Sequence, residues 1–164
     1  MAAEFTSFAA HWRGGSMQDD LWRYACELYA LPGMEAACLQ AQAQGADVCM
    51  ALCALWLEKR GVEWSAARGA CLQATVEAWS GPVIAPLRSL RQQWRHAALA
   101  DPALARLRES VKRLELEAEQ ALLERLEKTA EGWPPQRATE ARWLDWAVAD
   151  TNARLALRAT ATQS

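Results

Sequence analysis

One uninterrupted helix-forming stretch constrains the fold of this 164-residue chain more than any other feature. It begins at Asp101-Pro102, an N-cap residue followed by proline at the first helical position, and continues without glycine or further proline to Ala130. Apolar residues recur along it at alternating spacings of three and four, as in a coiled-coil seam: Leu104, Leu107, Val111, Leu114, Ala118 and Ala121. The seam predicts a partner helix, and a partner within the same chain is the simplest one.

The chain ahead of this stretch also favours helices. Ala and Leu are abundant whereas Ile, Val, Phe and Tyr are scarce, which is typical of helices rather than strands. Breaks at Pro32-Gly33, Gly45, Gly61 and Gly81-Pro82 separate five expected helices, at about residues 19–30, 34–44, 48–57, 65–79 and 82–99. The third of these is apolar on every side and is expected to lie at the centre of the fold.

A final helix is expected over residues 139–159, after the turn Gly132-Trp133-Pro134-Pro135. Because a short connection places consecutive helices antiparallel, this helix is predicted to fold back on the long one. The predicted class is therefore all-α, with a bundle of about five helices (17–100) followed by a long antiparallel helix hairpin (101–160). Together they form one domain over residues 17–160, with a short tail at 161–164.

Residues 1–16 show no long periodic pattern and end in Gly14-Gly15-Ser16. The codons for Arg-Gly-Gly-Ser just before Met17 can resemble a bacterial ribosome-binding site, which suggests that translation starts at Met17. A disordered tail of the translated protein is the other interpretation.

Charge, hydropathy and cysteine usage exclude several classes of protein. The net charge of −2 gives the whole molecule no general attraction for nucleic acid or an anionic membrane. The longest apolar run, Val48–Leu57, is too short to span a bilayer, and the N-terminus lacks the pattern of a signal peptide. Five cysteines, an odd number, lie within helical stretches, which is typical of reduced and buried thiols. The cytoplasm is the expected compartment.

The common catalytic and metal arrangements each lack a component. Cys49 and Cys53 are one helical turn apart, but no second pair of Cys or His completes a zinc site. His96 lies on a basic helix and is interpreted as a surface or helix-end histidine, and the glutamates within 115–119 are interpreted as a solvated face. No catalytic residue, metal or cofactor is expected. Whether the protein is an enzyme stays open, with the balance against it.

Several blocks of sequence together carry a resemblance to other proteins. They are Asp20-Leu21-Trp22-Arg23-Tyr24, Leu28-Tyr29, Pro32-Gly33, Cys38-Leu39, Gln42, Gly45, Asp47, Trp56-Leu57, Pro86-Leu87-Arg88, Arg91 and the stretch from Arg108 to Leu126. Through these residues the chain resembles a family of uncharacterised proteins of about the same length from Pseudomonas and related proteobacteria, classed as a domain of unknown function. The resemblance covers roughly residues 18–128 and implies an all-helical bacterial protein, but it implies no activity.

Two groups of residues are candidate binding sites. Arg88, Arg91 and Arg95 form one basic stripe, which either binds an anion or acidic partner or pairs with glutamates of the long helix. Trp143 and Trp146 are three residues apart, so one of them can meet a partner, although both can also pack internally.

These candidates support two hypotheses of function. The first is a small adaptor or regulator that binds another protein through the arginine stripe and the Trp143/Trp146 face. In this hypothesis nucleic acid and membrane are not expected as partners, and a homodimer stays open. The alternative is a ligand-binding protein or enzyme with an apolar pocket between the first and third helices, lined by Trp22, Tyr29, Cys53 and Trp56.

Overall fold

The computed structural model describes residues 21–135 and 142–162, and this part of the chain is helical without a β-strand. The all-α class is therefore confirmed. The helices are α2 (Leu21–Tyr29), α3 (Met34–Ala43), α4 (Val48–Lys59), α5 (Ala66–Trp79), α6 (Ala85–Gln93), α7 (Pro102–Thr129), α8 (Trp143–Ala147) and α9 (Thr151–Ala161), with a π-helical segment η1 (Ser80–Ile84) and a 3-10 turn η2 (Ala97–Leu99). The predicted tail 1–16 and the start at Met17 lie outside the described residues.

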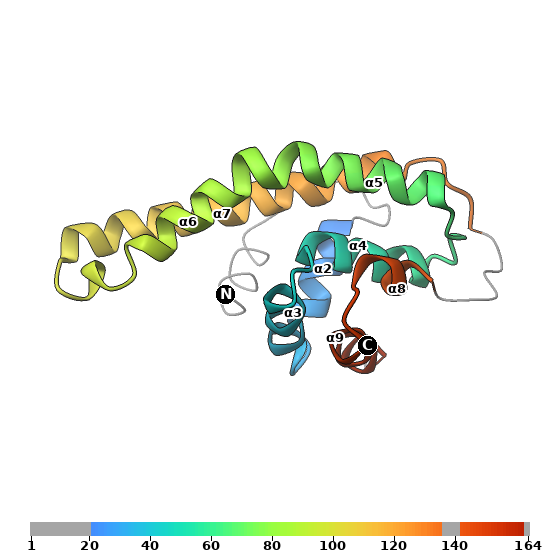
Figure 1. Ribbon diagram of the computed structural model, residues 1–164, viewed down its shortest axis with the longest axis horizontal. Coiled ribbons are helices and arrows are strands. Elements are labelled where there is room, and N and C mark those ends of the chain that lie inside the picture. The colour runs from blue at the N-terminus through green and yellow to red at the C-terminus, as the bar shows by residue number, and fades with distance from the viewer. Residues whose placement is uncertain (1–20, 136–141, 163–164) are drawn as a thin grey trace.

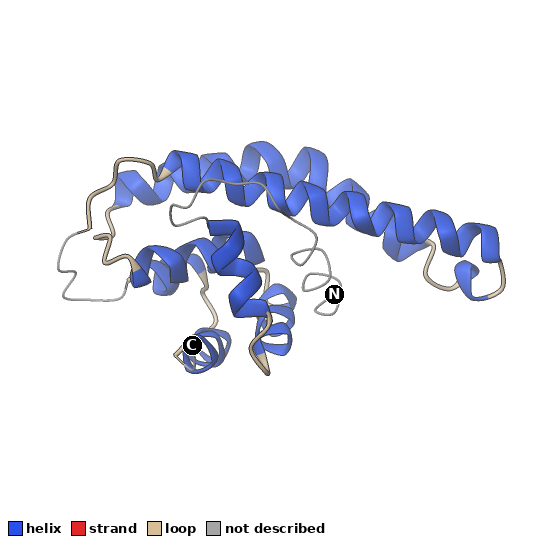
Figure 2. Ribbon diagram, turned by 180° about the vertical axis from the view of Figure 1, so that it is seen from behind, coloured by secondary structure: helices blue, strands red, loops and turns tan. Residues whose placement is uncertain are grey.

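The molecule consists of a long helical hairpin and a compact base (Figure 1). In the hairpin, α5, η1 and α6 follow one another as a continuous rod that runs antiparallel to α7. In the base, α2, α3, α4, α8 and α9 cluster against one half of the hairpin, which is also visible from behind (Figure 2). The other half projects beyond the base. We call this projecting part, residues 85–114, the arm.

The long helix α7 pairs with a different segment from the one predicted. Its partner is the α5–η1–α6 rod, whereas α8 packs on α4 and α9 packs on α3. The predicted hairpin of residues 101–160 is therefore wrong. The reason lies at Gly81-Pro82, which was expected to end a helix and instead lies inside η1. Pro82 has no N–H to donate, and the wider turn of a π-helix accommodates it without ending the rod.

The C-terminal segment is also divided differently. One helix was expected over 139–159; residues 139–141 lie outside the described part, and the described residues form the short α8 and then α9, separated by an extended link at Val148. Asp150 begins α9, since its side chain accepts a hydrogen bond from the N–H of Ala153 at 2.7 Å. Glu58 at the end of α4 attaches this segment to the base by accepting from the N–H of Leu144 at 2.8 Å and from Arg158 Nη2 at 3.0 Å.

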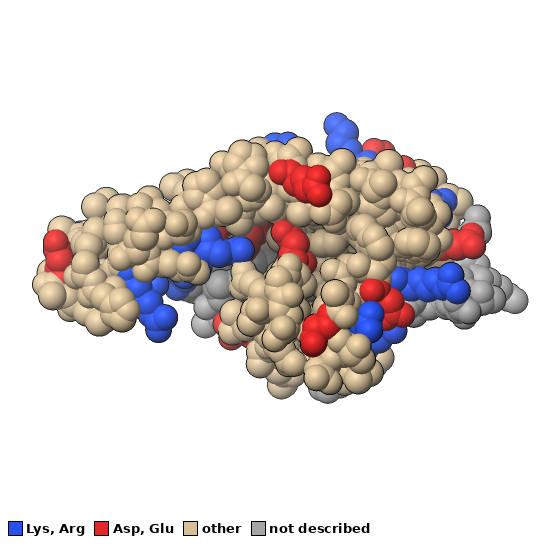
Figure 3. All heavy atoms as spheres, viewed as in Figure 1, with Lys and Arg blue, Asp and Glu red and all other residues tan. Residues whose placement is uncertain are grey.

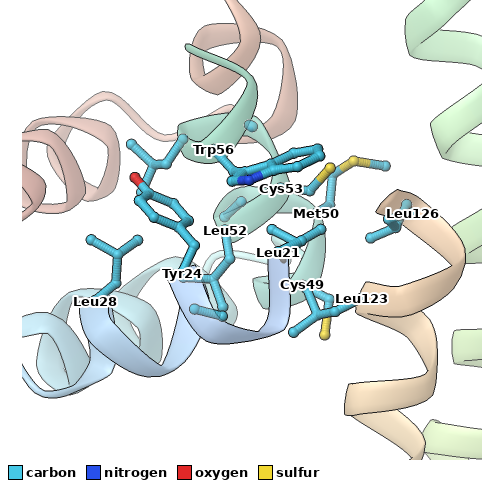
Figure 4. Packing of buried hydrophobic residues seen from close by; sticks show 14 of the residues in the cluster. Leu21, Tyr24, Leu28, Cys49, Met50, Leu52, Cys53, Trp56, Leu123 and Leu126 are labelled. Carbon is cyan, nitrogen blue, oxygen red and sulfur yellow. The ribbon is translucent and has the colours of Figure 1, made fainter. Parts of the chain in front are cut away.

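The hydrophobic core lies in the base and the adjoining half of α7. Every residue of α4 from Cys49 to Leu57 is buried, so its predicted central position is confirmed. Figure 4 shows Leu21 and Leu28 of α2 packed around α4, with Leu123 and Leu126 of α7 closing the other side. Burying a leucine side chain contributes about 2 kcal/mol, so this cluster stabilises the attachment of the hairpin to the base.

The predicted seam of α7 is only partly buried. Val111 and Ala118 are buried, but Leu107 and Leu114 are 55% and 50% exposed. Glu115 is buried instead, because it faces the arginines of α6. Within the described residues, no helix combines the length and the apolar character needed to cross a membrane.

Candidate functional site

Two arginines of the predicted stripe pair with α7. Arg88 donates from Nε to Glu115 Oε1 at 2.9 Å and from Nη2 to Glu119 Oε1 at 2.8 Å. Arg91 holds both oxygens of Glu115, Nε bonding to Oε2 and Nη2 to Oε1. Arg95 is exposed and forms no ion pair within the described part of the chain. The stripe is thus divided between an internal network and a free surface.

The two glutamates of this network differ in their protonation behaviour. Both are buried, with 4% of Glu115 and 8% of Glu119 exposed. Burial by itself raises the pKa of Glu115, but hydrogen bonds from Arg91 and Arg88 outweigh it and hold the pKa below its usual value. Burial raises the pKa of Glu119 to about 7, and the one hydrogen bond from Arg88 does not offset it. Glu119 therefore changes its charge near neutral pH.

Asp47 and Ser80 bring a second polar group to the same place. Asp47 is the N-cap of α4, and its Oδ1 accepts from the N–H of Met50 at 3.0 Å. Its Oδ2 accepts from Ser80 Oγ, the first residue of η1, at 2.9 Å. Because Asp47 belongs to the base and Ser80 to the hairpin, this bond joins the two parts. π-Helical segments frequently occur at functional sites.

A small pocket opens where these groups meet. Its volume is about 190 Å³, and its polar lining is Asp47, Cys49, Ser80, Arg88 and Glu119. Apolar side chains complete the wall: Val48, Ile84 and Ala85. We call it the junction pocket, since it lies between α4, η1, α6 and α7. Its convergent polar groups are a feature of ligand sites, and its volume is below the roughly 300–1,000 Å³ of sites for drug-sized ligands, so it suits only a small ligand.

Trp79 fixes the register of the hairpin beside the junction pocket. Its Nε1 donates to the carbonyl oxygen of Ala118 at 2.9 Å, and the guanidinium of Arg125 lies 3.7 Å from its ring centroid. Since Trp79 immediately precedes η1, these contacts hold the π-helical segment opposite Glu119.

The arm presents a basic surface interrupted by exposed leucines. Residues 85–114 contain seven basic and two acidic residues, a net charge of +5 in a chain whose total is −2. Leu99 is 85% exposed, and Leu107 and Leu114 are half exposed. Arg106 and Arg113, which precede these last two leucines, are exposed as well. Figure 3 shows basic side chains on the lower side of the arm.

Trp143 and Trp146 do not form an exposed binding surface. Trp143 is 1% exposed, donates from Nε1 to the carbonyl oxygen of Val62 at 2.7 Å, and stacks on Trp133 with ring centroids 5.8 Å apart. Trp146 meets Trp143 edge-on and covers Gly69, where an added Cβ would lie 3.1 Å from its ring. The interpretation in which both pack internally agrees with these contacts, although they pack on the base rather than on α7.

The residues proposed to line an apolar pocket are part of the packed core. Trp22, Tyr29, Cys53 and Trp56 all belong to one cluster of buried side chains, and Cys53 has no exposed surface. Trp56 borders a hollow at the surface, where the guanidinium of Arg60 lies 4.3 Å from its ring centroid. A pocket of about 410 Å³ does open between α2 and the end of α4, but of the four predicted residues its lining includes only Trp56. The rest of its lining is mainly polar or charged: Arg23, Tyr24, Glu27, Lys59, Arg60 and Pro135.

Sequence reasoning missed Asp47, Ser80 and Glu119 as a group. Glutamates that alternate with other residues on a charged helix resemble a solvated face, and only their pairing with Arg88 shows that one side is buried. The signal available in the sequence was that Arg88 and Arg91 are three residues apart and Glu115 and Glu119 four, so that each pair lies on one face of its helix. In the described segments, no three His, Cys, Asp or Glu side chains lie close enough to hold a metal ion.

Comparison with known proteins gives a family. The sequence matches the family described as protein of unknown function (DUF2390) over residues 20–126, which is more than half of the chain. No curated protein and no solved structure shows significant similarity to it. The resemblance to a domain of unknown function is confirmed, whereas the proteobacterial origin stays a prediction. This chain belongs to the DUF2390 family.

Proposed function

We propose that this protein is an interaction module whose arm binds an acidic helix of another protein. The observation that carries the proposal is a repeated pair of exposed residues on α7, Arg106-Leu107 and Arg113-Leu114. The two pairs are seven residues apart, so both leucines lie on one side of the helix, with both arginines beside them.

The position of this surface supports a docking role. The arm extends away from the base (Figure 1), so a partner helix can lie along α7 without meeting α2 or α4. Arg106 and Arg113 form no ion pair within the described residues, which leaves their charges for a partner. Leucines that are half exposed at heptad spacing are typical of a helix that packs against another helix.

The spacing of the exposed leucines and the charge of the arm favour a protein partner over a nucleic acid or an anionic membrane. Proteins bind nucleic acids largely through contacts to the phosphates, to which a row of leucines does not contribute. A membrane-bound helix presents a broad apolar face, whereas the leucine row here is narrow and interrupted by Ser110. An amphipathic partner helix whose leucines are flanked by glutamates matches both the exposed leucines and the neighbouring arginines of α7. The free thiols support a cytoplasmic location, which is part of this proposal.

A defined peptide tests the proposal. The probe is a synthetic helix with heptad leucines flanked by glutamates, and the matched control peptide carries lysines in place of the glutamates. Binding to the full-length protein is measured by fluorescence anisotropy at several salt concentrations. The acidic peptide should bind more weakly as salt rises, because exposed charges are screened. The basic peptide should not bind.

Substitutions locate the binding surface. The double variant Leu107→Asp/Leu114→Asp should lower the affinity about ten-fold or more, since it places charge in the apolar row. Leu155→Asp is the matched control, because Leu155 is 61% exposed on α9 in the base. Equal losses in both variants would refute the arm as the site. Preferential binding of duplex DNA or anionic vesicles would refute the class of partner, and a stable homodimer that buries α7 would make a second copy the occupant.

A further inference from the structure

We propose that the junction pocket binds a small primary amine in its ammonium form, held by Glu119, Asp47 and Ser80. This site is separate from the arm surface, so the outcome of one test does not decide the other. The argument rests on the balance of charge in the pocket, the acceptors it offers, and its size.

The groups around the junction pocket include one more carboxylate than guanidinium groups. Two buried carboxyl groups, Glu115 and Glu119, pair with Arg88 and Arg91, and the half-buried Asp47 adds a third carboxylate that bonds to Ser80 instead of an arginine. An excess negative charge in a buried place is costly, and either a proton or a bound cation removes it. Glu119 is the member that lacks a full set of partners, since Glu115 receives three hydrogen bonds from the arginines and Glu119 receives one.

The pocket offers acceptors to a donor ligand. Oε1 of Glu119 accepts from Arg88, and within the described residues no hydrogen bond reaches Oε2. Ser80 Oγ donates its proton to Asp47, so its lone pairs are left to accept. An ammonium group has three N–H donors and no acceptor, which suits this set.

The other groups near Glu119 add no positive charge at neutral pH. Burial raises the pKa of the Cys49 thiol, keeps the pKa of the Tyr29 hydroxyl well above its usual value, and raises the pKa of the Cys38 thiol to about 11. These three groups are therefore neutral near pH 7. The charged and titratable groups that face Glu119 are Asp47 and Cys49 of the α4 end, Arg88 of α6, Glu115 of α7, Tyr29 of α2 and Cys38 of α3.

The size and walls of the pocket limit the ligand. A volume of about 190 Å³ corresponds to about six water molecules of roughly 30 Å³ each. Val48, Ile84 and Ala85 provide the apolar part of the lining. A short alkyl chain that ends in an ammonium group matches both features.

Calorimetry with three small probes tests the inference. n-Butylammonium is the ligand probe, and butan-1-ol and butyrate are the neutral and anionic controls of similar size. The full-length protein should bind n-butylammonium and neither control. Binding should be about ten-fold weaker at pH 6 than at pH 8, because protonation of Glu119 competes with the cation. Near pH 7 binding should release protons, which titrations in buffers of different ionisation enthalpy detect.

Variants separate binding from a merely structural role. Glu119→Gln keeps the size of the side chain and an acceptor for Arg88, and it should lower the affinity at least about ten-fold and abolish proton release. Glu117→Gln is the matched control on the exposed side of α7 and should bind as the unaltered protein does. Circular dichroism checks that both variants remain folded.

Three results would overturn the inference. One is the absence of saturable binding of n-butylammonium at concentrations about ten times a millimolar Kd. Another is an unchanged affinity in Glu119→Gln. The third is binding of butyrate in preference to the amine, which would assign the pocket to an anion held by Arg88.

Discussion

Replacing Glu119 with glutamine should stabilise the protein at alkaline pH and leave it almost unchanged at acidic pH. Burial raises the pKa of this carboxyl from 4.5 to about 7. Between these values the folded state holds a proton that the unfolded state has released, so the free energy of unfolding falls as pH rises. Glutamine resembles the protonated acid and does not incur this loss.

The raised pKa sets the magnitude of the effect. Raising the pKa of Glu119 from 4.5 to about 7 corresponds to about 3 kcal/mol. The resulting decrease in the free energy of unfolding of the unaltered protein is nearly complete at pH 8 and amounts to less than about 1 kcal/mol at pH 5. Glu119→Gln should therefore exceed the unaltered protein by about 3 kcal/mol in the free energy of unfolding at pH 8.

Urea denaturation followed by tryptophan fluorescence measures this difference at the two pH values. Comparing the variant with the unaltered protein at each pH cancels the contributions of other groups, including the opposite effect of Glu115, whose pKa is lowered. Glu117→Gln controls for the general loss of a negative charge from α7. A stability difference that is the same at pH 5 and pH 8 would refute the reasoning.

Three further predictions concern the same region. Arg91→Met should lower the free energy of unfolding by about 2 kcal/mol in urea denaturation, because it leaves buried Glu115 with Arg88 as its ion-pair partner and removes the pair with Arg91. An unchanged denaturation midpoint would contradict this prediction. Asp47→Ala should lower the free energy of unfolding by about 2 kcal/mol, because α4 loses its N-cap and the base loses a hydrogen bond to η1. A decrease of less than about half of that value would show that the cap is dispensable. A thiol reagent should modify exposed Cys71 first and reach Cys49, which is buried and whose pKa is raised, only on unfolding; early modification of Cys49 would place it at the surface.

The helix boundaries were largely predictable because the signals that set them are local. Asp47 caps α4 and Asp101 caps α7 through hydrogen bonds within three residues along the chain. The apolar character of residues 48–57 was enough to place that helix at the centre. Gly81-Pro82 misled the prediction, since the same pair ends a helix in one context and lies in a π-helical turn in another.

The candidate site was predictable only in part. The arginines at 88 and 91 were identified from their spacing, and their pairing with glutamates of the long helix was one of two interpretations. The junction pocket was not predicted, because Asp47 and Glu119 are 72 positions apart in the printed sequence and meet only through the base and the hairpin. The protonation of Glu119 depends on burial, which helical periodicity could not assign while the partner of α7 was unknown.

By itself the sequence determined an all-helical chain, the ends of most helices and a long charged helix with too few apolar residues to be buried on all sides. Each of these depends on caps, breaks and periodicity that act within a few residues. Only the tertiary structure decided that α7 pairs with α5 and α6, that Leu107 and Leu114 face outward, and that Glu115 faces inward. Those outcomes depend on contacts between distant segments, among them the buried leucines of α7 in the core and the ion pairs of Arg88 and Arg91 with Glu115.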